Sequence, residues 1–146
     1  MYMTIHSYVR TTLWLTLAGV LFAGYLSAMK LITNTCALNE PCPYVWGHPA
    51  CWYGFGMFLI MFVATLVAFV RADDRRWVVW VNVGVSLLGI AFAGTLVWRE
   101  LAHAASISSA FGYTLGLPSC AYGLIVYAAI FILSVLMLMR GHRSHG

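Results

Sequence analysis

Long stretches of apolar residues, separated by short polar segments, dominate the hydrophobic pattern of the 146-residue chain. Four stretches reach the roughly 20 residues that an α-helix needs to cross a bilayer. We predict crossings near residues 12–29, 51–70, 77–97 and 120–139. The pattern therefore predicts an all-α integral membrane four-helix bundle, in which residues 1–146 form a single transmembrane domain.

The second half of the chain resembles the first. The segments GHPACWYG at 47–54 and GLPSCAYG at 116–123 lie 69 positions apart, and each leads into a long apolar run. The segments GVLFAGYL at 19–26 and GIAFAGTL at 89–96 lie 70 positions apart, so the second connecting loop is one residue shorter. Because such self-similarity indicates duplicated structural units, we predict two helical-hairpin repeats, at about 12–71 and 77–140.

The repeats are expected to be parallel. A hairpin contains an even number of crossings, so both copies enter from the same side and are related by an axis along the membrane normal. Cys51 and Cys120, which occupy equivalent places at the starts of two helices, then lie at the same membrane face.

Composition and charge agree with a membrane protein and predict its orientation. The chain is 62% hydrophobic and only 8% charged, whereas soluble domains average about 25% charged residues. Short loops rich in Lys and Arg stay in the cytoplasm. We therefore predict a multi-pass protein of a bacterial or archaeal plasma membrane, with both termini cytoplasmic and the cysteine loops extracytoplasmic. The basic residues of the predicted cytoplasmic segments are Arg10, Arg71, Arg75, Arg76, Arg140 and Arg143.

This topology accounts for the net charge of +4, so no nucleic-acid partner is expected. The first crossing could be read as a secretion signal, but its match to the third crossing indicates that it is retained. Membrane lipid is the expected surrounding.

The four cysteines fall on or near the predicted outer side, where disulfides persist. Cys36 and Cys42 could close a small disulfide ring, although four cysteines permit three pairings. Cys51 and Cys120 each follow a proline, a residue favoured in the first helical turn, where the helix dipole stabilises a thiolate. A thiolate attacks disulfides. The alternative is that both are small buried apolar residues or an inert staple between the repeats.

Small residues predict close packing. Gly54 and Gly123 lie on the helical face of each cysteine and leave room beside the thiol for a flat ligand or for another helix. Gly19 and Gly89, each four residues before an alanine, let helix backbones approach closely in lipid. No metal site is expected, because the cysteines do not have C-x-x-C spacing and a set built on the nearest histidine would depend on Cys51.

The run YLSAMKL at 25–31, followed by Cys36, CPYV at 42–45, GHP at 47–49 and Gly54, resembles the first half of vitamin K epoxide reductase proteins. Those proteins have two loop cysteines and a Gly-x-Pro entry to the next helix. A bundle with thiols at one face is also similar to the bacterial quinone-linked disulfide oxidases. The resemblance covers about residues 19–62. The family's C-x-x-C at the start of a late helix is missing, because the matching region contains only Cys120.

The resemblance implies a membrane thiol–disulfide oxidoreductase. If its chemistry is retained, Cys51 and Cys120 must form the membrane-embedded dithiol. An extracytoplasmic thioredoxin-like partner would reduce a Cys36–Cys42 disulfide, electrons would pass to Cys51 and Cys120, and a quinone would accept them. Aromatic residues of such helices are candidates to line the quinone pocket, although they also act as packing or interfacial residues. The candidates are Trp52, Tyr53, Tyr122 and Tyr127.

Two other classes of function stay open. A non-catalytic membrane subunit with structural disulfides fits every feature without requiring reactivity, and facilitation of an uncharged small molecule also stays open. An ion-coupled transporter is disfavoured, because coupling requires an intramembrane carboxylate or equivalent and no Asp or Glu lies in a predicted crossing. Asn82 is the main strongly polar residue there. The electron acceptor, the direction of electron flow and the oligomeric state stay open.

Overall fold

The computed structural model describes residues 4–33, 44–71, 76–106 and 119–143. Within these ranges, each of the four helices contains a span long and apolar enough to cross a membrane. This confirms the predicted helical fold and supports a multi-pass membrane protein. In chain order the elements are α1 (Ile5–Thr33), β1 (Tyr44–Val45), β2 (His48–Pro49), α2 (Ala50–Arg71), α3 (Arg76–Ser106) and α4 (Ser119–Arg143).

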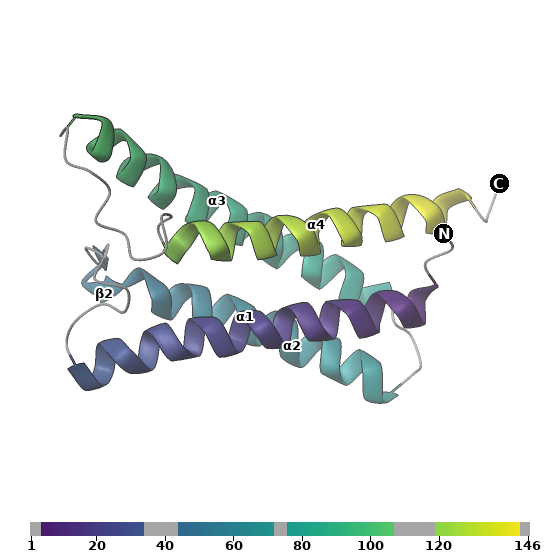
Figure 1. Ribbon diagram of the computed structural model, residues 1–146. Helices are drawn as coiled ribbons and strands as arrows, with labels where there is room; N and C mark the ends of the chain where they lie inside the picture. The colour runs from purple at the N-terminus through teal and green to yellow at the C-terminus, as the bar shows by residue number, and fades with distance from the viewer. Residues whose placement is uncertain (1–3, 34–43, 72–75, 107–118, 144–146) are drawn as a thin grey trace.

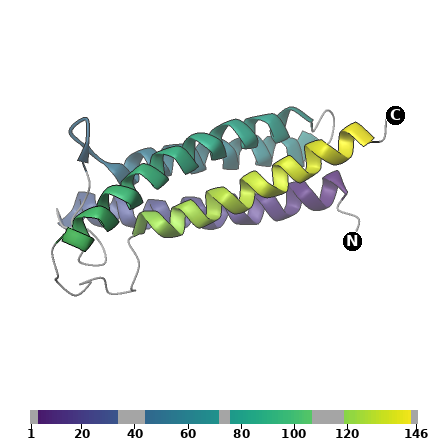
Figure 2. The ribbon, with the colours of Figure 1, turned by 90° about the horizontal axis from the view of Figure 1, so that it is seen from above.

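The four helices lie side by side and alternate in direction (Figure 1). Helix α1 packs most extensively on α2, and α3 on α4, and further contacts join α2 to α3 and α1 to α4. Helices α2 and α4 begin at one end of the bundle, which we call the thiol end because it holds Cys51 and Cys120. Helix α1 begins and α4 ends at the opposite end, the terminal end, as the view from above also shows (Figure 2).

The described residues form two apolar clusters in the interior. In lipid the backbone polar groups must form hydrogen bonds within the chain, and the helices satisfy this requirement. How the helices pack on one another then depends on the size and shape of their side chains. One cluster lies toward the terminal end and includes Tyr8, Val9, Ala64, Ala68, Val78 and Val79. The other lies in the middle of the bundle and consists of Ala23, Phe58, Met61, Tyr127 and Ile130.

A short β-hairpin, which the hydrophobic pattern does not predict, precedes α2. Tyr44 pairs with Pro49 and Val45 with His48 in antiparallel register. The two turn residues, Trp46 and Gly47, have φ angles of 50° and 81°. Positive φ at both positions is the type I′ arrangement of two-residue hairpins. Because Pro49 belongs to the hairpin, α2 begins one residue later, and Cys51 is the second residue of the helix.

Candidate thiol site and its aromatic support

Cys51 and Cys120 occupy the same position in their helices, since each is the second residue of α2 or of α4. Both are partly buried thiols rather than members of a disulfide. Both helix starts lie at the thiol end (Figure 1). Cys36, Cys42 and Pro118 lie outside the described residues. Within the described ranges, no group of three or more His, Cys, Asp or Glu side chains could hold a metal ion.

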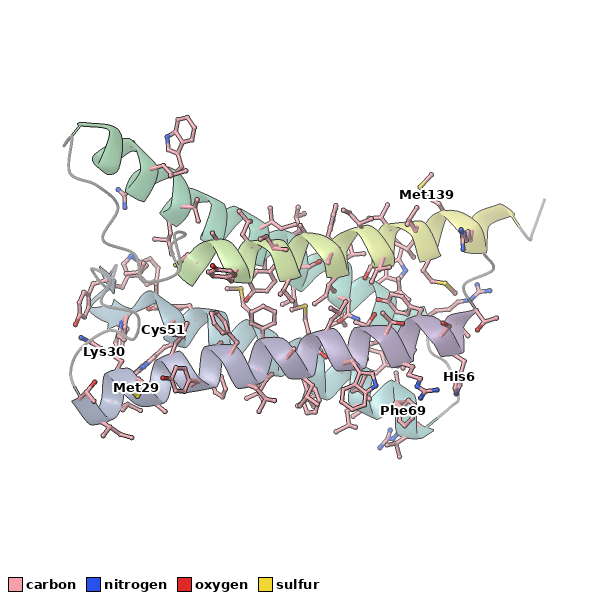
Figure 3. The ribbon with its side chains drawn as sticks, viewed as in Figure 1. His6, Met29, Lys30, Cys51, Phe69 and Met139 are labelled. Carbon is pink, nitrogen blue, oxygen red and sulfur yellow. The ribbon has the colours of Figure 1, made fainter. Side chains whose placement is uncertain are left out.

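The start of α2 is fastened to its neighbours on two sides. Ser27 of α1 donates a hydrogen bond of 3.4 Å to the carbonyl oxygen of Cys51. The Tyr53 hydroxyl donates to the carbonyl oxygen of Val45 in β1, also at 3.4 Å. Figure 3 shows Cys51 at the same end as Met29 and Lys30, near the end of α1. These contacts fix the backbone around Cys51 relative to α1 and the hairpin.

One tyrosine follows each cysteine and contacts the other hairpin of helices. The Tyr53 ring lies 5.7 Å from the ring of Phe92 in α3, at an interplanar angle of 49°. The Tyr122 ring lies 6.2 Å from the ring of Phe22 in α1, edge-on at 63°. Aromatic contacts between the helix pairs α1–α2 and α3–α4 thus support both thiol-bearing helix starts.

Phe58 of α2 and Tyr127 of α4 form an aromatic stack at the middle of the bundle. Their centroids are 4.3 Å apart with an interplanar angle of 7°, and each side chain is only 2% exposed. A Cβ atom at Gly19 would overlap the Phe58 ring, and one at Gly89 would lie 2.6 Å from Cδ1 of Tyr127. Each ring therefore rests on the backbone of a glycine in the neighbouring helix.

The space beside Gly54 is taken by another helix, which was one of its two expected uses. The Tyr127 hydroxyl donates a hydrogen bond of 3.1 Å to the carbonyl oxygen of Gly54, one turn after Cys51. At Gly123, the residue 69 positions later, no described atom lies within 4 Å of a built Cβ. The two thiol-bearing turns therefore differ in their contacts with the described residues.

The four aromatic candidates for the quinone pocket differ in their contacts and exposure. Tyr53, Tyr122 and Tyr127 make the packing contacts given above. Trp52 is 39% exposed, and its ring lies 5.7 Å from that of His48 in β2.

Sequence reasoning did not single out the partners of these tyrosines, Phe22, Phe58 and Phe92. Their spacing carried a signal, because Phe22 and Phe92 are 70 positions apart, and Phe58 is 69 positions before Tyr127. A comparison of aromatic positions between the two halves would have found them. No family model matches the chain, and no significant match was found among curated proteins or solved structures.

Proposed function

We propose that this protein is a membrane thiol–disulfide oxidoreductase in which Cys51 and Cys120 form the redox-active pair. The observation that carries the proposal is that two partly buried thiols occupy the same position at the starts of two helices that begin at one end of the bundle. The positive end of a helix dipole lowers the energy of a thiolate relative to a thiol. Both cysteines occupy this position in their helices.

We also propose that the two helical hairpins are parallel copies of one duplicated unit. Contacts at the same sequence offsets support this. Gly19 meets Phe58 as Gly89 meets Tyr127, and Phe22 meets Tyr122 as Phe92 meets Tyr53. Such a pair of copies makes Cys51 and Cys120 equivalent residues, each seven positions before the ring that its own helix contributes to the aromatic stack.

The β-hairpin supports Cys42 as the loop cysteine that exchanges with Cys51. Tyr44 pairs with Pro49, and Cys51 follows Pro49 by two residues. Cys42 precedes Tyr44 by two residues, so chain connectivity alone keeps its Cα within about 8 Å of that of Tyr44. Cys36 is six residues further from the hairpin and is under no comparable constraint.

The proposed relay is balanced in electrons and protons. A thioredoxin-like partner reduces the Cys36–Cys42 disulfide. The Cys42 thiolate then attacks the sulfur of Cys51 in a Cys51–Cys120 disulfide, which releases Cys120. Cys36 resolves the mixed disulfide by attacking Cys42, and the pair Cys51 and Cys120 is left reduced. A quinone then takes two electrons and two protons from this dithiol and becomes a quinol.

Among the aromatic candidates, we assign the quinone contact first to Trp52, because it is partly exposed and adjacent to Cys51 in the chain. For orientation we propose cytoplasmic termini and an extracytoplasmic thiol end, since short basic loops stay in the cytoplasm. The contacts of Tyr53, Tyr122 and Tyr127 favour a second candidate, a non-catalytic membrane subunit, because they serve packing without requiring reactivity.

The test is thiol trapping in intact membranes with single Cys→Ala variants. We expect Cys120 to become accessible to alkylation when the substrate thiol is added, and to be protected again when quinone is supplied. Cys51→Ala should leave Cys120 permanently alkylatable. If Cys51 and Cys120 are alkylated independently in every redox condition, the oxidoreductase proposal fails and the subunit takes its place.

A further inference from the structure

Five of the fully buried polar side chains gather toward the terminal end of the bundle, far from the thiols. We call them the polar node. Thr65, one of its members, lies 14 residues after Cys51 in α2, which corresponds to about 21 Å along a helix. Each member is 0% exposed, and every helix contributes at least one. The members are Tyr8, Thr12, Thr65, Asn82 and Ser134.

Hydrogen bonds of the node connect all four helices. The Tyr8 hydroxyl oxygen of α1 lies 2.7 Å from Oγ of Ser134 in α4. Nδ2 of Asn82 in α3 donates to the Tyr8 hydroxyl at 3.1 Å. The same nitrogen donates to Oγ1 of Thr65 in α2 at 3.3 Å. Asn82 is therefore the centre of a network that spans the bundle.

The donor and the acceptor of each hydrogen bond in this network follow from counting the available protons. The Thr65 hydroxyl donates to the carbonyl oxygen of Met61, and the Ser134 hydroxyl donates to that of Ile130, each at 2.7 Å. A hydroxyl has one proton, so both oxygens can only accept further bonds. Tyr8 must then donate to Ser134, which leaves the Tyr8 oxygen as an acceptor as well.

The same count of donors and acceptors fixes the orientation of the Asn82 amide. The oxygen and nitrogen of an amide are assigned from their hydrogen-bond network. Tyr8 and Thr65 both need a donor, so the NH₂ group faces them. The carbonyl oxygen Oδ1 is consequently the end of the amide whose bonding is not satisfied by either residue.

Two atoms of the node make no hydrogen bond within the described part of the chain, namely Oδ1 of Asn82 and Oγ1 of Thr12. Thr12 has an unused proton and Asn82 an unused acceptor. Thr12 lies one turn after Tyr8 on the same face of α1, and Tyr8 reaches Asn82 directly. Leaving both atoms buried without partners is unfavourable, above all in a membrane, where bulk water cannot compensate.

We propose that Thr12 and Asn82 bind one water molecule inside the bundle. The water accepts the Thr12 proton and donates one of its own to Oδ1 of Asn82. Water fits because it both donates and accepts, and buried waters typically satisfy polar groups that lack protein partners. An ion fits less well, because none of the five side chains of the node is a carboxylate, a histidine or a base. This site is independent of the thiol chemistry proposed above.

The decisive variant is Thr12→Val, which preserves shape and removes only the hydroxyl. If the water is bound, the variant deprives it of a partner, and the unfolding equilibrium constant should rise about three- to tenfold. If the Thr12 hydroxyl is instead unpaired, Val removes an unfavourable group and the constant should fall. The sign of the change therefore distinguishes the two cases. A constant that falls or stays the same overturns the proposal.

Thr16→Val is the matched control. Thr16 is equally buried, but its hydroxyl donates to carbonyl oxygens of its own helix, those of Thr12 and Leu13. It should leave the bound water in place.

A second measurement on the unaltered protein does not depend on the folding of a variant. With ¹⁵N-labelled asparagine in nanodiscs, the Asn82 side-chain amide should show magnetisation transfer from a long-lived water. The signal should persist in Thr16→Val and vanish in Thr12→Val. Absence of the signal from the unaltered protein overturns the proposal, even if Thr12→Val is destabilised, because the hydroxyl would then contact Asn82 directly.

Discussion

At the scale of single residues, two absent side chains shape the centre of the bundle. Gly19 and Gly89 each bring a helix backbone against the face of an aromatic ring. The rings of Phe58 and Tyr127 are held between these two backbones and against each other, so neither can move aside easily.

We therefore expect Gly19→Ala and Gly89→Ala to lower the free energy of unfolding by about 1–3 kcal/mol each, since overpacking a filled interior forces side chains out of position. Gly56 and Gly84 provide matched controls, because a Cβ there meets no described atom within 4 Å. Alanine at those sites should be neutral or stabilising by up to about 1 kcal/mol. Denaturant titration in detergent micelles would measure the difference, and equal effects at all four glycines would contradict the packing described.

The hydroxyl of Tyr127 has a separate role from its ring. Tyr127→Phe keeps the stack but removes the hydrogen bond to Gly54. We expect a loss of about 0.5–1.5 kcal/mol in unfolding free energy, the usual net value of one such bond. Tyr25→Phe is the control, because that side chain is 57% exposed and should change little. A loss no larger than the control's would mean that the hydrogen bond contributes nothing.

At the scale of elements, the β-hairpin contains the positive φ angles found in the described part of the chain. Trp46 has φ of 50°, a conformation uncommon for a residue other than Gly, Asn or Asp. Its side chain is 92% exposed, so burial of the ring does not explain the conformation. The conformation is explained instead by the register of the two short strands, which the hydrogen bond from Tyr53 to Val45 helps to hold.

Gly47→Val should disrupt this turn, because a β-branched residue is strained at φ of 81°. If the hairpin keeps Cys42 near Cys51, the yield of their mixed disulfide should fall severalfold in a Cys36→Ala, Cys120→Ala background under mild oxidation. Trp46→Asn removes the aromatic ring but tolerates the left-handed backbone, so its yield should stay high. Equal yields in the two variants would show that the β-hairpin does not position Cys42 for exchange with Cys51.

Hydropathy located the four helices but not all of their limits. Helix α1 begins at Ile5, seven residues before the predicted crossing. The helix extends through the polar residues His6 and Arg10, which lie outside the apolar stretch that hydropathy detects. The hairpin was not predicted because its strands have two residues each and its turn begins with tryptophan, which is not a turn-forming residue. Such local geometry depends on contacts with the first turn of α2.

At the scale of the whole molecule, the even number of crossings per hairpin was enough to place Cys51 and Cys120 at the same end. It was not enough to identify the polar node toward the terminal end. Asn82 stood out as polar in the sequence, but its partners Tyr8 and Thr65 lie 74 and 17 positions away on other helices. Only the packed bundle brings these positions together.

Labelling from one side of the membrane tests this arrangement. A membrane-impermeant maleimide should react with Cys51 and Cys120 from the same side, and with a cysteine introduced by Arg71→Cys only from the other side, because α2 ends at the terminal end. Our proposed orientation predicts that the two native thiols react from outside the cell. Reaction of all three from one side would contradict a membrane-spanning α2.

Since α1 begins and α4 ends next to each other at one end of the bundle (Figures 1 and 2), we expect the order of the two helical hairpins in the sequence to be exchangeable. A circular permutant that starts at Arg76, carries a short linker between the old ends and stops at Arg71 should insert and assemble as the original does. Its circular dichroism spectrum and detergent resistance should match those of the parent. The shape of this protein would then depend on which helices are paired as hairpins, and not on which hairpin the ribosome makes first.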